Sequence, residues 1–123
     1  MSDIIETIRI SEKGKQQLSR LKRSTGISNW NTLCRWALCT SLAEPSVPPK
    51  EEIPADSNVE MTWKTFAGEH AEIYLAIIRQ RLIEDDLSND ELGEWFRIHL
   101  HRGISFMSNS YKDHTSILDK AIA

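Results

Sequence analysis

The four histidines are the side chains best suited to binding a metal ion, and their spacing argues against a shared site. His99 and His101 are two residues apart, so on a helix they face nearly opposite sides. His70 and His114 have no companion at ligand spacing. His99 falls on an apolar helix face, where a hydrogen-bonded core histidine is the expected structural role. The chain also has no glycine-rich phosphate loop. The sequence therefore predicts a binding protein that is not an enzyme and needs no metal or other cofactor.

The two cysteines, Cys34 and Cys39, lie in one apolar stretch. They are not a Cys-x-x-Cys pair, and their separation on a helix prevents a bond between them. Buried free thiols are typical of a reducing cytosol. Residues 1–10 lack the features of a signal peptide, and no window approaches the ~20 apolar residues of a membrane span. We therefore expect a cytoplasmic protein.

Positive charge is concentrated in the first third of the chain. Residues 1–43 hold seven Lys and Arg against three acids, whereas residues 44–123 hold eight against fifteen acids, and the whole chain has a net charge of −3. A basic module on an acidic body is the pattern expected when one surface meets phosphates. The predicted DNA-binding residues are Lys13, Lys15, Arg20, Lys22 and Arg23, together with Arg9 and Arg35.

The elements that carry these cations are predicted to be a strand and two helices. Residues 4–11 alternate as in a short strand. The basic helix that follows has a thin apolar seam at Leu18 and Leu21, and Gly26 occupies the position of a C′ glycine. A second helix runs from an N-cap at Ser28 to Pro45 and is apolar nearly all round, which predicts burial.

This N-terminal module suggests assembly with a second copy of the chain. No other stretch is an obvious partner for the strand, and the second helix is too apolar for the surface of a small monomer. A strand, a basic helix and an apolar helix, in that order, are similar to a ribbon–helix–helix DNA-binding module, in which strands of two chains pair. The fold class predicted is therefore mainly α, with a short N-terminal strand.

The remaining residues are expected to complete a single domain, 1–123. Residues 1–44 form the basic module, residues 45–58 a proline-rich linker, and residues 59–123 an acidic helical part. Residues 59–66 are ambiguous between strand and helix, with helix favoured. A helix is expected from Glu69, and a second one opens at the capping box Ser88–Glu91. Gly103 is expected to end that helix, with a loop over 104–111 and a short helix over Tyr111–Ile122.

Three blocks of the sequence resemble the DndE family of the bacterial DNA phosphorothioation system. The first lies within Gly26–Ser46 and contains GISNWN, LCRWALC and SLAEPS. The second is NVEMTWK at Asn58–Lys64, and the third is FRIHLHRGI at Phe96–Ile104. The blocks follow one another in the expected order, and the match is weakest in the linker and the last dozen residues.

The resemblance implies a role in replacing a non-bridging phosphate oxygen of DNA with sulfur. It implies binding of duplex DNA, including nicked duplex, by a homotetramer that works beside the other modification proteins. In such systems a cysteine desulfurase supplies the sulfur and ATP-using partners carry out the chemistry.

Two other functions are compatible with the same residues. One is a transcriptional regulator of the ribbon–helix–helix kind, in which the outward strand residues Thr7 and Arg9 would read base edges. Base-specific protection in footprinting would favour it. The other is a non-catalytic assembly adaptor whose basic face meets an acidic protein, and a mobility shift on DNA alone would argue against it.

Overall fold

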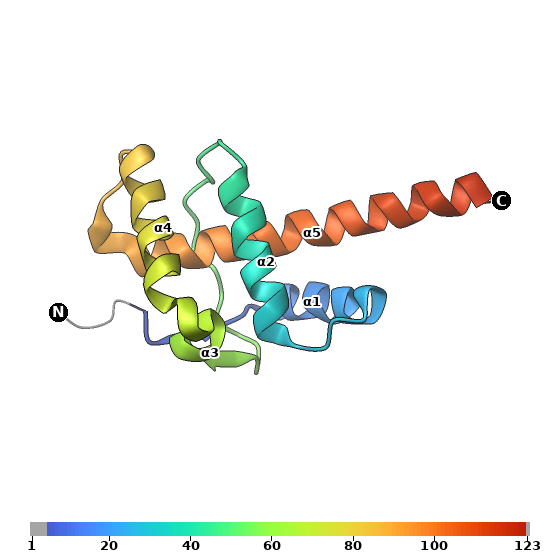
Figure 1. Ribbon diagram of the computed structural model, residues 1–123, viewed down its shortest axis with the longest axis horizontal. Helices are drawn as coiled ribbons and strands as arrows, with labels where there is room; N and C mark the ends of the chain where they lie inside the picture. The colour runs from blue at the N-terminus through green and yellow to red at the C-terminus, as the bar shows by residue number, and fades with distance from the viewer. Residues whose placement is uncertain (1–4, 123) are drawn as a thin grey trace.

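The computed structural model describes residues 5–122, and side chains as far as Ser110. The described part is mainly helical, which confirms the predicted class (Figure 1). The elements in chain order are β1 (Thr7–Arg9), α1 (Glu12–Thr25), α2 (Trp30–Ala43), β2 (Glu60–Thr62), α3 (Trp63–Ala67), η1 (Gly68–His70), α4 (Ala71–Glu84), η2 (Asn89–Glu91) and α5 (Leu92–Ile122). No helix among the described residues is long and apolar enough to cross a membrane.

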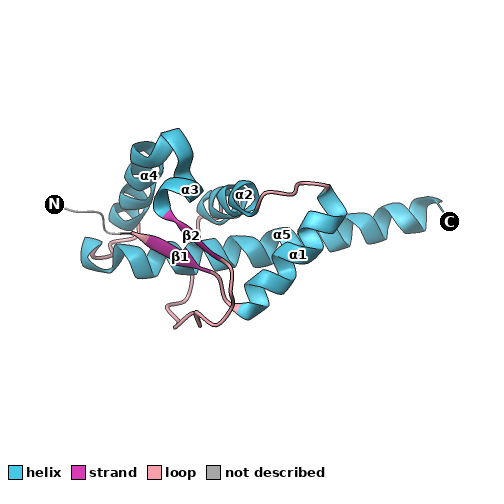
Figure 2. Cartoon of the chain, turned by 90° about the horizontal axis from the view of Figure 1, so that it is seen from below, coloured by secondary structure: helices cyan, strands magenta, loops and turns pink. Residues whose placement is uncertain are grey.

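The long helix α5 is the element on which the others pack, and α1 runs along it while α2 crosses it (Figures 1 and 2). At the crossing of α2 and α5 lies Gly103, which is buried. A Cβ atom at this position would lie 1.7 Å from the carbonyl oxygen of Ala37 in α2. Glycine is therefore required here by the close approach of two helices.

The predicted end of this helix at Gly103 is wrong, because α5 continues without a break to Ile122. The predicted loop over 104–111 and the separate helix over Tyr111–Ile122 are wrong for the same reason. A glycine inside a helix costs only about 1 kcal/mol relative to alanine. Packing of α5 against α2 offsets the cost of this glycine, because Leu100 and Ile104 near Gly103 are fully buried.

The N-terminal strand pairs within its own chain. β1 and β2 are antiparallel, with Ile8 opposite Met61 at the centre. The expectation that the strand has no partner in its own chain is therefore wrong, and the reason for expecting a two-chain ribbon is removed. The preference for helix across the whole of 59–66 is also wrong, because the strand β2 comes first and α3 begins only at Trp63. The strand-like alternation of Val59, Met61 and Trp63 overlaps a helical spacing of equal strength in the same stretch.

The two helices of the basic module form much as their sequences indicate. Gly26 ends α1 with a φ of 79°, a left-handed conformation that glycine adopts without strain. Leu18 and Leu21 are buried as predicted. The N-cap of α2 is Asn29 and not Ser28.

The expectation that α2 is buried nearly all round is only partly right. Leu33, Cys34, Ala37 and Leu38 are fully buried, but Cys39 is exposed and 53% of Trp36 remains accessible. Burial raises the pKa of the Cys34 thiol to about 12, so this cysteine stays protonated and unreactive.

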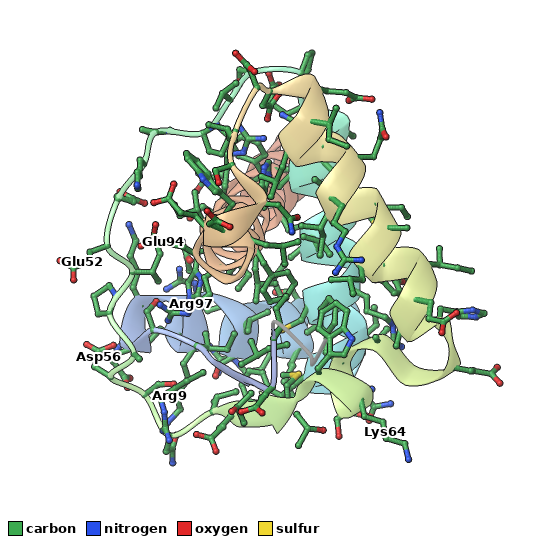
Figure 3. The ribbon with its side chains drawn as sticks, turned by 90° about the vertical axis from the view of Figure 1, so that its left-hand side faces the viewer. Arg9, Glu52, Asp56, Lys64, Glu94 and Arg97 are labelled. Carbon is green, nitrogen blue, oxygen red and sulfur yellow. The ribbon has the colours of Figure 1, made fainter. Side chains whose placement is uncertain are left out.

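The linker between α2 and β2 is held against the body by two arginines of α5. Arg102 donates from Nη1 to the carbonyl oxygen of Ser46 in the linker at 2.9 Å, and from Nη2 to that of Ser41 in the last turn of α2 at 2.7 Å. Arg97 donates to the carbonyl oxygen of Ile53 at 2.7 Å. Figure 3 shows Arg97 directed inward from α5. These bonds place the linker in a defined path beside α1.

Candidate nucleic-acid interface

Helix α1 carries five of the seven predicted DNA-binding cations on its solvent side. Lys13, Arg20 and Arg23 are exposed, and no side chain that the structure describes pairs with any of them. Ser11 caps the helix, accepting from the backbone N–H of Gly14 at 3.0 Å, and the buried Leu18 and Leu21 fix which face points outward. The structure thus brings these cations together on one helix.

Lys15 and Lys22 lie on one flank of the same face and each has a local partner. The Lys15 ammonium donates to Oδ1 of Asn58 at 2.7 Å. The Lys22 ammonium lies 4.1 Å from the ring centroid of Trp30, in a cation–π contact. Neither partner carries a negative charge, so both lysines keep their positive charge available to a phosphate.

Arg9 and Arg35 lie away from this face and are bound within the fold. Arg9 forms an ion pair with Glu60 and donates to the carbonyl oxygen of Ser57 at 2.8 Å. Arg35 donates to the carbonyl oxygen of Phe66 at 2.8 Å. In Figure 3, Arg9 lies at the end of the linker, near the paired strands β1 and β2. The sequence shows the charge of both residues but not these acceptors, which are 31 to 51 positions away.

Sequence reasoning missed an acidic contribution to this surface. A cleft of about 440 Å³ lies between α1, the linker and α5, and Lys13 shares its lining with Glu51, Glu52 and Asp56. Asp56 accepts from the backbone N–H of Glu12 at 2.8 Å, which places its carboxylate at the N-terminus of α1. The prolines and acids at 45–58 were the available signal, but their position beside α1 depends on the arginines that bind the linker.

His99 and His101 occupy structural positions. His99 is buried, and its Nδ1 lies 2.8 Å from Oγ of Ser41, which also accepts from Nε of Arg102. Burial, with the nearby charges of Arg81 and Arg102, lowers the pKa of His99 to about 4. The prediction that His99 is a hydrogen-bonded core residue is confirmed.

His101 connects α5 to the start of α1. Its Nδ1 donates to the carbonyl oxygen of Arg97 at 2.8 Å, and its Nε2 accepts from the backbone N–H of Ser11 at 3.1 Å. Burial lowers the pKa of His101, which favours this neutral form. Within the part of the chain that the structure describes, no three His, Cys, Asp or Glu side chains come together to hold a metal ion.

Comparison with known proteins gives a consistent result. The family model for DNA sulphur modification protein DndE matches residues 7–115. The crystal structure of DndE from Escherichia coli B7A, involved in DNA phosphorothioation modification, is similar with a TM-score of 0.71 and 20% identity, covering 86% of this chain and 99% of that chain. A search of curated proteins found no match.

A mutant DndE involved in DNA phosphorothioation has also been solved. It is similar with a TM-score of 0.64 and 19% identity, over 85% of this chain and 97% of that chain. At such identities the two structures support the shared fold. The family model covers most of the sequence, from β1 into α5. The chain therefore belongs to the DndE family of DNA sulphur modification proteins.

Proposed function

We propose that this protein is a DNA-binding component of the DNA phosphorothioation machinery and has no catalytic activity of its own. The observation that carries the proposal is the outward face of α1, where Lys13, Arg20 and Arg23 are exposed and lack a partner among the described side chains. An acidic chain cannot bind DNA through its net charge and needs such a local basic face.

The proposed ligand is duplex DNA, including nicked duplex, and the proposed contacts are to phosphates. Lys15 and Lys22 contribute beside the three exposed cations, and Arg9 and Arg35 have a smaller part because both are bound within the fold. Contacts to phosphates position a protein on DNA without reading its sequence. The ion pair of Arg9 with Glu60 argues against the regulator alternative, in which Arg9 would read base edges.

The proposed assembly is a homo-oligomer, with a tetramer favoured by the family resemblance. The N-terminal strand does not support an oligomer, because it has a partner in its own chain. What supports the proposal is exposed apolar surface: Trp36 on α2 and Ile73, Ile77 and Ile83 on α4 are between 44% and 70% accessible. Ile73 and Ile77 are one turn apart on α4, and exposed apolar side chains that lie side by side commonly mark an interface.

The other proteins of the sulfur modification system are the proposed protein partners, and the cytoplasm is the proposed location. An adaptor without DNA affinity remains the second candidate, because the exposed cations of α1 also suit contact with an acidic protein.

The decisive experiment titrates the purified protein with intact, nicked and single-stranded DNA of one sequence at two salt concentrations. We expect binding to duplex whose affinity falls with salt, with a log–log slope of about −0.9 per phosphate contacted. Reversing charge with Lys15→Glu/Lys22→Glu should weaken binding to every sequence alike and flatten the slope. If the native chain binds none of the three DNAs at low salt, the adaptor function is favoured instead.

A further inference from the structure

The basic face of α1 has two ends with different electrostatic surroundings. At its N-terminal end, Lys13 lines the same cleft as Glu51, Glu52 and Asp56. At its C-terminal end, Arg20, Lys22 and Arg23 lie outside the lining of this cleft. An anion at the N-terminal end of this face therefore lies near carboxylates as well as a lysine, whereas an anion at the C-terminal end lies near cations outside that cleft.

The acids are held beside Lys13 by the fold. Asp56 is bonded to the first turn of α1 through the backbone N–H of Glu12, at 2.8 Å. The adjoining linker is bound by Arg97, which donates to the carbonyl oxygens of Ile53 and Pro54 at 2.7 and 3.3 Å. In Figure 3, Glu52 and Asp56 lie along the outer edge of the linker, and both residues are exposed. Their charges consequently face any ligand that approaches this end.

The separation along the helix decides how far this repulsion reaches. Arg23 is ten residues beyond Lys13, which is about 15 Å along an α-helix. The Debye length at physiological ionic strength is about 8 Å, so the linker acids act on a phosphate at Lys13 and are largely screened at Arg23.

We propose that the acidic linker restricts DNA to the C-terminal half of α1, so that Arg20, Lys22 and Arg23 make the main phosphate contacts while Glu51 and Glu52 weaken contact at Lys13. This inference rests on the proposed DNA-binding function and refines it. The duplex lies across the end of α1 and the turn to α2, and the linker acids set the boundary of the binding surface.

The test compares neutral variants of exposed residues by DNA titration at low and physiological salt. We expect Arg20→Gln and Arg23→Gln each to lower affinity about five-fold or more and to reduce the salt slope by about 0.9, as for a lost phosphate contact. Lys13→Gln should lower affinity less than two-fold. Asp56 is left unchanged, because its bond to α1 is structural.

A second pair of variants tests the linker itself. Glu51→Gln/Glu52→Gln should raise affinity about three-fold at low salt and less at high salt, as expected for two charges acting through water. When Glu51 and Glu52 are neutralised, Lys13→Gln should lower DNA affinity more than it does in the native chain. A double-mutant cycle measures this coupling. The matched control is Glu69→Gln/Glu72→Gln, which removes the same charge from exposed positions of η1 and α4, beyond α2 from α1 (Figure 1), and should leave affinity unchanged.

The outcomes separate this inference from the function on which it rests. If the native chain binds DNA but Lys13→Gln costs as much as Arg23→Gln, or neutralising Glu51 and Glu52 changes affinity no more than the control does, the linker does not limit the surface. If the native chain and all variants fail to bind any DNA at low salt, the proposed function fails and this inference with it.

Discussion

Arg81 is a buried arginine whose guanidinium donates to one carboxylate and three carbonyl oxygens within the fold. It is buried, and Nε donates to Oδ2 of Asp85 at 2.7 Å. Its two terminal nitrogens donate to the carbonyl oxygens of Leu42, Glu44 and Ser46 at 2.8 to 2.9 Å. A cation at the C-terminus of a helix also interacts favourably with the helix dipole. Arg81 therefore holds the end of α2 and the start of the linker to α4.

We expect Arg81→Gln to lower the free energy of unfolding by about 3 kcal/mol, because it leaves a buried carboxylate and several carbonyl oxygens without a partner. Chemical denaturation of the variant measures this loss. Arg79→Gln, on the exposed side of the same helix, should stay within about 0.5 kcal/mol of the native chain. Equal effects of the two substitutions would contradict the structural role given to Arg81.

His99 gives the protein a defined sensitivity to acid. Its pKa is about 4 in the folded chain against 6.5 for a free histidine, so the unfolded state binds more protons between these values. The stabilising contribution is complete above pH 6.5 and is lost progressively as the pH falls toward 4. Acidification over this range protonates His99, which is hydrogen-bonded to Oγ of Ser41. It thereby disturbs the bond that Arg102 donates to the same oxygen.

We expect the free energy of unfolding to decline as the pH is lowered from 6.5 to 4, and His99→Gln to show a smaller decline from a lower starting value. Denaturation at a series of pH values provides the measurement. His70→Gln, at an exposed position, is the control and should follow the native pH profile. A His99→Gln profile parallel to the native one would show that other groups cause the acid sensitivity.

At the scale of elements, the crossing of α2 over α5 is the contact that organises the fold. Gly103 permits it, since a Cβ there would overlap the backbone of Ala37. Backbone cannot move aside as the tip of a flexible side chain can, so the two helices would have to separate.

Gly103→Ala should therefore destabilise the protein by about 3 kcal/mol or prevent folding, although alanine is the better helix former. Thermal unfolding followed by circular dichroism measures the change in Tm. Asn109→Ala, at an exposed position of α5, should leave Tm unchanged or raise it slightly. A Gly103→Ala protein as stable as the native chain would show that the helices are not constrained at this point.

At the scale of the whole molecule, exposed apolar side chains lie on α2 and α4, and Arg81 of α4 donates to the carbonyl oxygen of Leu42 at the end of α2. Trp36 is the largest of them, with 53% of its surface accessible. Its removal from a single chain should cost little stability, while its removal from an interface should dissociate the assembly.

We expect the native chain to be an oligomer at micromolar concentration and Trp36→Glu to be a folded monomer, because a buried unpaired carboxylate is incompatible with an apolar interface. Light scattering measures the mass, and circular dichroism checks the fold. Ala55→Glu, which adds the same charge at an exposed linker position, should retain the native mass. A monomeric native chain would rule out the proposed oligomer.

The local features of this protein follow from the sequence because their causes lie within a few residues. The seam of Leu18 and Leu21, the left-handed Gly26 and the cations along α1 depend on helical spacing and on steric limits of the backbone. The mainly helical class was predictable for the same reason. The family blocks span distant parts of the chain, and the family model confirms that resemblance.

Which residues contact one another over long sequence separations was decided only by the tertiary structure. Ile8 lies opposite Met61, Arg35 donates to Phe66, and the linker acids lie beside Lys13, all through contacts between residues more than 30 positions apart. Gly103 shows the same limit, since a glycine that ends a helix and one that admits a crossing helix look identical in sequence. The energy that distinguishes them comes from α2, which the spacing around Gly103 does not reveal.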